Sequence, residues 1–296
     1  MQPGLKPVEK HLLVTISDDI NALFGLRFVY NLLTRRDQVR ITLFSVAPRS
    51  GDDGTIGGPF NAAQDGLNYI KTVRNIPASL SAARDWLLGM GFPPDRVLLK
   101  CSPSQMGTVK DIAMEAERGL YDAVVLGRRG LGWFDEFFQD SVTHRLLWES
   151  ITFPLWVCRN PIRHGRNVLL CMDGSEQAMR MADHVGFVLR DEPQHGVTVF
   201  HNRAGARPEG QHIDDMLGAA GAILMENGIE EERITYLVKS SKHPAELILR
   251  EAHETEYAAV AVGRSGGKPD SRTNLFGSLS LTLLRTLEGS ALWISK

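Results

Sequence analysis

The sequence GRSGG occupies Gly263–Gly267 and is followed after nine more residues by Gly277-Ser278. An apolar run, Ala258–Val262, precedes it, and an apolar run with helical spacing, Leu279–Leu287, follows it. This order predicts a strand, a glycine-rich loop and a helix. Glycines let backbone N–H groups approach an anion closely, and a helix N-terminus adds a positive dipole. The stretch is a candidate phosphate-binding loop, although the commoner explanation of such glycines alone is a loop that only turns the chain.

Length and composition exclude several classes of protein. The 296 residues suffice for one large domain or two of ordinary size, and 43% hydrophobic residues suffice for a packed core. A net charge of -2 and a pI near 6.5 give no general attraction to nucleic acid or to an anionic membrane. No apolar run approaches the length of a membrane span, and no export signal is recognisable, so we expect a cytoplasmic protein. We expect the three cysteines to be buried reduced thiols: Cys101, Cys158 and Cys171.

The predicted elements repeat once along the chain. The first series of predicted strands is His11–Ser17, Arg40–Val46, Arg96–Cys101, Tyr121–Leu126 and Phe153–Cys158. The second series is Asn167–Met172, Val197–His201, Ile234–Val238, Ala258–Val262 and Ala291–Ser295. Helical patterns separate the strands, and the longest, Leu67–Met90, is expected to break near Pro77. The pattern predicts two α/β domains, residues 1–160 and 166–296, each a five-stranded parallel sheet with helices on both faces.

The glycine loop also recurs in both copies. The first copy has Gly127-x-x-Gly130, nine residues and then Asp140-Ser141. The second has Gly263-x-x-Gly266, ten residues and then Gly277-Ser278. Each loop follows the fourth predicted strand of its copy, and ligands of open parallel sheets bind at the carboxyl ends of strands where the strand order reverses. Recurrence at the same place argues against a loop of arbitrary sequence.

These residues resemble the universal stress proteins, here with two domains in tandem. The mark of that family is Gly-x-x-Gly, nine residues and Gly-Ser or Gly-Thr after the fourth strand, with Asp-Gly-Ser or similar after the first, as at Asp173-Gly174-Ser175. The resemblance covers about Lys10–Cys158 and Arg166–Lys296 and implies two Rossmann-like domains of the adenine-nucleotide alpha-hydrolase type. It also implies that the fifth strands of the domains pair, here as a pseudo-dimer within one chain. Whether two chains form a homodimer stays open.

The resemblance further implies an ATP site in the second domain, accompanied by Mg²⁺. By position, the adenosine moiety would face Cys171, Met172 and Asp173, and the base would border Asn202. The ribose and phosphates would meet Gly263, Arg264, Ser265 and Gly266, with Gly267 absorbing the one extra residue of the loop. The phosphate site would be closed by Gly277, Ser278 and Leu279. The sequence predicts neither a catalytic residue nor a metal-binding side chain.

The first copy departs from the pattern at two positions. Ser17 stands where the second copy has Asp173, and Asp140 stands where it has Gly277. A carboxylate at the phosphate end adds like charge and a side chain where close approach is needed, which Arg128 and Arg129 would offset only in part. We therefore expect the nucleotide in the second domain and a degenerate site in the first.

The sequence predicts a stress-response or regulatory protein that binds ATP or another adenine nucleotide without marked catalysis and acts on an unidentified protein partner. A nucleotide-free module for protein–protein interaction is the main alternative, favoured by Ser17 and Asp140. An ATP hydrolase or adenylate-forming ligase comes third. The stretch Ser265–Ser271 resembles the pyrophosphatase loop of such ligases, but it has one residue too many and follows the fourth strand instead of the first.

Overall fold

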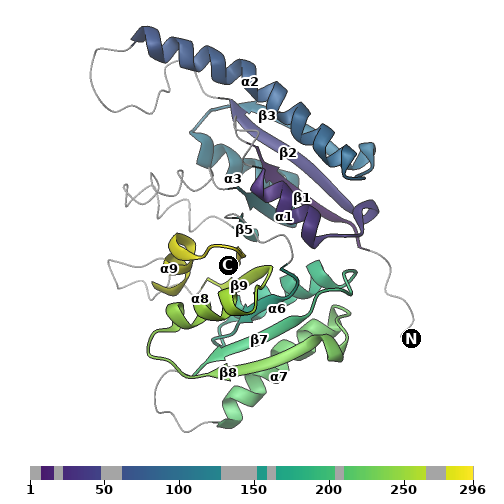
Figure 1. Cartoon of the computed structure of the whole chain (residues 1–296), viewed down its shortest axis with the longest axis vertical. Coiled ribbons are helices and arrows are strands. Elements are labelled where there is room, and N and C mark those ends of the chain that lie inside the picture. The colour runs from purple at the N-terminus through teal and green to yellow at the C-terminus, as the bar shows by residue number, and fades with distance from the viewer. Residues whose placement is uncertain are drawn as a thin grey trace.

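Ten strands form one continuous sheet in the computed structural model, which describes residues 8–16, 23–47, 62–127, 152–158, 165–203, 210–264 and 278–295 (Figure 1). From one edge to the other the strands are β3 (Val97–Pro103), β2 (Val39–Ala47), β1 (Lys10–Thr15), β4 (Ala123–Leu126), β5 (Leu155–Cys158), β10 (Ala291–Ser295), β9 (Ala259–Gly263), β6 (Val168–Cys171), β7 (Val197–Asn202) and β8 (Ile234–Lys239). Neighbouring strands are parallel, except that β5 and β10 are antiparallel.

The sheet consists of two halves with the same strand order. In each half the first strand lies between the second and the fourth, and the fifth lies at the seam. The central strands β4, β5 and β6 are buried along their whole length, as expected for parallel strands that are covered on both faces. The predicted α/β fold class is therefore confirmed, and so is the pairing of the two fifth strands within one chain. The domain boundaries at residues 160 and 166 stay a prediction.

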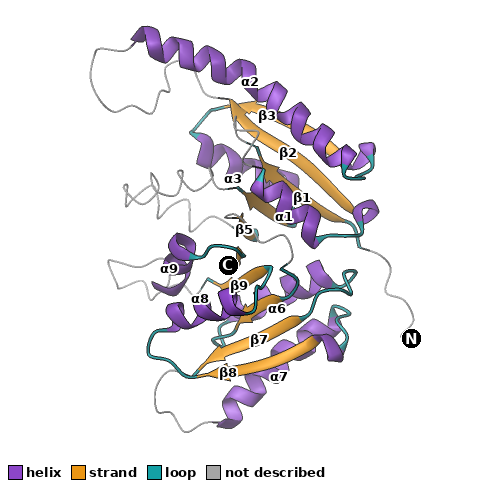
Figure 2. Cartoon of the chain, in the orientation of Figure 1, coloured by secondary structure: helices purple, strands orange, loops and turns teal. Residues whose placement is uncertain are grey.

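Helices cover both faces of the sheet (Figure 2). One face packs against α1 (Phe24–Leu32), α2 (Ala62–Gly89), α6 (Glu176–Leu189) and α7 (Gly210–Glu226). The other packs against α3 (Thr108–Gly119), α8 (Pro244–Glu254) and α9 (Ser278–Thr286). Short 3-10 helices precede three of the strands: η2 (Arg36–Gln38), η3 (Pro94–Arg96) and η5 (Glu231–Arg233). Among the described residues, no helix has both the length and the apolar character needed to cross a membrane.

The longest helix differs from its prediction. α2 continues through Pro77 without interruption, so the expected break is wrong. Proline removes one helical hydrogen bond, but the side chains of Ile76, Leu80 and Leu87, on either side of it, are buried in the core. The helix predicted at Ser141–Trp148 lies outside the described residues.

Two stacked tryptophans mark the seam between the halves. Trp156 of β5 and Trp293 of β10 are directly opposite, with ring centroids 4.4 Å apart and ring planes 8° apart. Phe28 of α1 and His184 of α6 flank this pair, each with its ring centroid about 6 Å from both indoles. The indole N–H of Trp156 donates to Nε2 of His184 over 2.9 Å, whereas the buried N–H of Trp293 has no acceptor in the described part of the chain.

A polar contact on the same side of the sheet ties the halves together. The carboxylate of Glu192 is fully buried and accepts hydrogen bonds from the backbone N–H of Thr34 at 2.9 Å and from its hydroxyl at 2.6 Å. The backbone N–H of Arg35 adds a third donor at 3.2 Å. The ring of His195 also contacts the carbonyl of Leu32, with Nε2 at 2.9 Å from the oxygen. The turn after α1 is thus fixed to the turn after α6, so the two halves meet through apolar and polar contacts alike.

Candidate functional site

The sheet of the second half has its topological switch at β6. The chain passes from β6 through β7 to the edge strand β8, and it then returns to β9 on the other side of β6. The carboxyl ends of β6 and β9 are adjacent, because Cys171 pairs with Val262. Such a switch leaves a crevice at the carboxyl ends of the strands, where ligands of open α/β sheets bind. Asp173 follows β6 and Gly263 ends β9, so both residues lie at this switch point.

A tight turn carries Asp173 from β6 into α6. Gly174 has a φ of +80°, a left-handed conformation that favours glycine. Oδ1 of Asp173 accepts hydrogen bonds from the backbone N–H of Ser175 at 2.9 Å and from its hydroxyl at 2.5 Å. The same hydroxyl oxygen caps α6 by accepting from the N–H of Ala178 at 3.2 Å. Asp173 is exposed, so the turn holds one carboxylate oxygen in place and leaves the other toward solvent.

Gly263, the first glycine of the loop, is needed for packing. A Cβ atom at this position would lie 2.3 Å from the backbone nitrogen of Ala178 and 2.5 Å from the carbonyl carbon of Gln177. Those atoms belong to the first turn of α6, so only glycine lets the end of β9 lie against that helix. This requirement holds whether or not a ligand binds, and it brings the start of the glycine loop beside the N-terminus of α6.

The start and the end of the glycine loop are both fixed to the sheet. The N–H of Arg264 donates to the carbonyl of Ser295 at 2.7 Å, and the Arg264 side chain is buried. Ser278 is the first residue of α9, and Leu279 packs against the apolar cluster beneath it. The rest of the predicted loop lies outside the described residues: Ser265, Gly266, Gly267 and Gly277. The same is true of the first copy's Ser17, Arg128, Arg129, Asp140 and Ser141.

Asn202 lies where the base-binding wall was predicted, at the end of β7. Its side-chain N–H donates to the carbonyl of Ser241 at 3.1 Å, and its side-chain oxygen accepts from the N–H of Ser241 at 2.9 Å. Both ends of the amide therefore bind the loop after β8. Asn202 is half-buried, and the hydrogen bonds to Ser241 hold its side-chain amide in one orientation. Its residue type alone did not indicate this role.

Cys171 and Met172 are both buried, with 9% and 3% of their surfaces exposed. Burial raises the pKa of the Cys171 thiol, so this sulfur is an unreactive core atom. Cys158 is buried as well, but Cys101 is exposed on the edge strand β3, so the expectation of three buried thiols is wrong for Cys101. The N–H of Met172 donates to the carbonyl of Phe200 at 2.8 Å, and the Met172 carbonyl lies 2.8 Å from Nδ1 of His201. Of the three residues predicted to face adenosine, Asp173 alone has an exposed side chain. No sequence pattern indicated His201, whose position depends on the pairing of β6 with β7.

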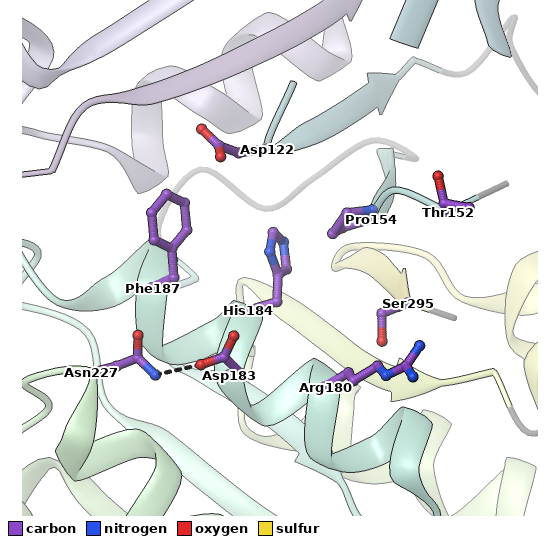
Figure 3. A pocket seen from close by; sticks show the side chains of 9 residues that line it. All are labelled: Asp122, Thr152, Pro154, Arg180, Asp183, His184, Phe187, Asn227 and Ser295. Carbon is purple, nitrogen blue, oxygen red and sulfur yellow. Dashed lines mark hydrogen bonds between the residues drawn. The ribbon is translucent and has the colours of Figure 1, made fainter. Parts of the chain in front are cut away.

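The seam between the halves contains a cavity of about 350 Å³, which sequence reasoning missed because its residues come from five separate segments (Figure 3). It is lined by Asp122, Thr152, Pro154, Arg180, Asp183, His184, Phe187, Asn227 and Ser295. We call it the seam cavity. No group of three or more His, Cys, Asp or Glu side chains suited to a metal occurs within the described ranges.

Comparisons with known proteins agree with the geometry. Residues 165–292 match the model of the Universal stress protein family. A universal stress protein from Archaeoglobus fulgidus DSM 4304 is 14% identical, with a TM-score of 0.62 over 97% of this chain and 98% of that one. A structure from Pseudomonas aeruginosa UCBPP-PA14, assigned to the same family, is 13% identical, with a TM-score of 0.53 over 97% and 93% of the two chains.

A universal stress protein solved in complex with cAMP matches only 44% of this chain, with 18% identity, 96% coverage of that chain and a TM-score of 0.36. A match at this level does not extend its ligand to this protein. No curated protein matches the sequence. The full-length structural matches show the fold of both halves, and residues 165–292 match the model of the Universal stress protein family.

Proposed function

We propose that the second half binds ATP or another adenine nucleotide at the crevice between β6 and β9, and that the protein acts in a stress response without marked catalysis. One observation carries the proposal. The exposed carboxylate of Asp173 and the start of the glycine loop at Gly263 meet at the topological switch of the sheet, within the residues that match the family.

Each part of this edge suits one part of a nucleotide. The free carboxylate oxygen of Asp173 would accept hydrogen bonds from ribose hydroxyls. The backbone N–H groups of the loop after Arg264, together with the N-termini of α6 and α9, would face the phosphates with positive dipole. Mg²⁺ would neutralise phosphate charge when bound. Because the described residues offer no cluster of metal ligands, the ion would be held by phosphate oxygens and water.

Two observations favour the alternative, a nucleotide-free module for protein–protein interaction. Gly263 is required by packing against α6 even without a ligand. The amide of Asn202 is occupied by Ser241, so it offers little to an adenine ring. In this alternative the glycine loop would serve the packing of the fold and bind no nucleotide. Mg-ATP would then leave the thermal stability of the protein unchanged.

The proposal that turnover is negligible rests on the sequence, in which no general base is recognisable next to the expected phosphate. Release of phosphate from Mg-ATP tests it directly. Turnover well above the spontaneous rate would overturn it and would support the hydrolase alternative.

Thermal melting with and without millimolar Mg-ATP separates binding from the nucleotide-free alternative. We expect a clear rise in Tm, because a ligand that binds only the folded state stabilises it by mass action. Asp173→Asn keeps an oxygen for Ser175 but removes the charge, and it should weaken ATP affinity roughly ten-fold. Asp214→Asn, an equal charge change on the exposed face of α7, is the control. An unchanged Tm at millimolar Mg-ATP would contradict the proposal.

A further inference from the structure

The seam cavity is built from both halves. At Ser295 it adjoins the start of the glycine loop, because the carbonyl of Ser295 accepts a hydrogen bond from the N–H of Arg264. The second half contributes Arg180, Asp183, His184 and Phe187, which follow one another at helical spacing along one side of α6. The first half contributes Asp122, before β4, and Thr152 and Pro154, before β5. Figure 3 shows these side chains arranged around a common space between the halves. A volume of about 350 Å³ lies within the range of pockets that hold small molecules.

His184 directs a hydrogen-bond donor into this space. Its Nε2 accepts from the indole N–H of Trp156, so in the neutral ring the proton must be on Nδ1. No described residue accepts from Nδ1, although only 8% of the His184 surface is exposed. Figure 3 shows the imidazole pointing into the cavity. A ligand that fills this space would satisfy the donor by presenting an acceptor atom.

The charge that faces the cavity is negative. Arg180 is engaged by Glu176, with 2.5 Å between the guanidinium nitrogen and the carboxylate oxygen. Asp183 and Asp122 have no ion-pair partner within hydrogen-bonding distance among the described residues. Asp183 accepts a hydrogen bond from the amide of Asn227 at 2.9 Å, and Asp122 accepts one from the N–H of His11 at 2.6 Å.

Lys10 is the other cation near this site. Its ammonium group lies 3.4 Å from the carboxylate of Asp191 and 5.9 Å from the centre of the Phe187 ring. It is buried and does not line the cavity. Within the cavity, Asp183 is contacted by the neutral amide of Asn227, whereas the charge of Lys10 also acts on Asp122. Asp183 in particular therefore favours a ligand with positive charge.

Phe187 and Pro154 add apolar surface opposite one another (Figure 3). An aromatic ring can pack against both. We propose that the seam cavity binds a small aromatic amine in its ammonium form. Its ammonium group faces Asp183 and Asp122, its ring lies between Phe187 and Pro154, and an acceptor atom on the ring receives the Nδ1–H of His184.

The test uses three probes of nearly identical shape: tyramine, which is a cation, tyrosol, which is neutral, and 4-hydroxyphenylacetate, which is an anion. Binding to the full chain is followed by the NMR resonance of the Trp156 indole N–H, because this group is hydrogen-bonded to His184. Trp156→Phe identifies that resonance among the five tryptophans. Tyramine should shift it saturably below about 10 mM, with tyrosol binding at least roughly five-fold more weakly and the anion not at all.

Two charge-matched variants locate the site. Asp183 is exposed, so Asp183→Asn should fold normally and keep an oxygen for Asn227, and it should weaken tyramine binding roughly five-fold or more. Asp214→Asn on α7 should leave binding unchanged. The proposal is overturned if tyramine produces no saturable shift, if the three probes bind equally well, or if the two variants bind tyramine alike.

Discussion

The two halves of the sheet share a strand order but differ in the polar side chains at the seam and at the predicted nucleotide positions. Both halves bury their central strands completely, and both place an aromatic or imidazole ring against the seam tryptophans. At the equivalent seam position the first half has Phe28 and the second has His184. At the predicted nucleotide positions, the first half has Ser17 and Asp140 where the second has Asp173 and Gly277. The shared features are those that burial requires, and the differences concern hydrogen bonding and charge.

The largest effect is expected from a variant that removes the difference between the two halves at the predicted phosphate site. Gly277→Asp gives the second half the carboxylate that the first half has at Asp140. It should abolish the stabilisation by Mg-ATP, because a like charge and a side chain enter the predicted phosphate site. Asp140→Gly should leave that stabilisation largely unchanged, and Tm measured with and without Mg-ATP checks both. Persistence of the full Tm rise in Gly277→Asp would place the nucleotide elsewhere.

Gly263→Ala tests whether the glycine is a packing requirement. The added carbon would lie 2.3 Å from the backbone nitrogen of Ala178, so either β9 or α6 must shift. We expect a loss of about 3 kcal/mol in the free energy of unfolding, measured by urea denaturation without nucleotide. Gly218→Ala in α7, where the new methyl group has open space, should instead gain about 0.5–1 kcal/mol. Similar values for the two variants would rule out the packing role.

The stability of the seam should depend on pH through His184. Burial lowers the pKa of His184 from 6.5 to about 3. As the pH falls below 6.5, the His184 imidazole becomes protonated in the unfolded chain but stays neutral in the folded chain. The free energy of unfolding therefore decreases until the pH approaches 3. This loss is about 1.4 kcal/mol per pH unit and is absent from His184→Phe.

Urea denaturation of the wild type and of His184→Phe between pH 7 and pH 5 measures this effect. The stability advantage of the wild type over the variant should shrink as the pH falls. The reciprocal variant Phe28→His gives the N–H of Trp293 an acceptor and should steepen the loss with falling pH. A pH-independent difference between the wild type and His184→Phe would show that His184 is not held neutral at the seam.

The smallest expected effect is a difference in stability between variants of the two stacked tryptophans. Trp156→Phe removes a donor and leaves Nε2 of His184 unpaired, whereas Trp293→Phe removes an N–H that has no acceptor among the described residues. Both variants lose the same volume from the same stack. Trp156→Phe should therefore cost about 1–2 kcal/mol more than Trp293→Phe in the free energy of unfolding. Equal costs would mean that the hydrogen bond to His184 contributes nothing.

Most of the fold could be predicted from the sequence because parallel strands buried on both faces read as apolar runs. Val168–Cys171 and Ala259–Gly263 are such runs, and their repetition along the chain predicted two α/β halves. The pairing of the fifth strands was instead implied by the family resemblance. The predicted break in the helix at Pro77 was wrong. It considered the loss of one helical hydrogen bond but not the packing of α2 on the sheet.

The site was predictable only in part. Gly263 was recognised from local spacing and Asp173 from the family resemblance, but the contact between Gly263 and α6 depends on the strand order, which no local pattern encodes. Asn202 was placed correctly at a strand end, yet its bonds to Ser241 depend on the register of β7 with β8. The seam cavity combines residues as far apart as Asp122 and Ser295, and no spacing rule relates them.

If the second half alone binds an adenine nucleotide, each chain binds one Mg-ATP, and the stoichiometry of binding distinguishes this from two working sites. Isothermal titration calorimetry on the full chain should give one site per chain, and Asp173→Asn should weaken that site. A stoichiometry of two would show that the first half has kept its site despite Ser17 and Asp140. The absence of any binding at millimolar Mg-ATP would contradict the proposed function itself.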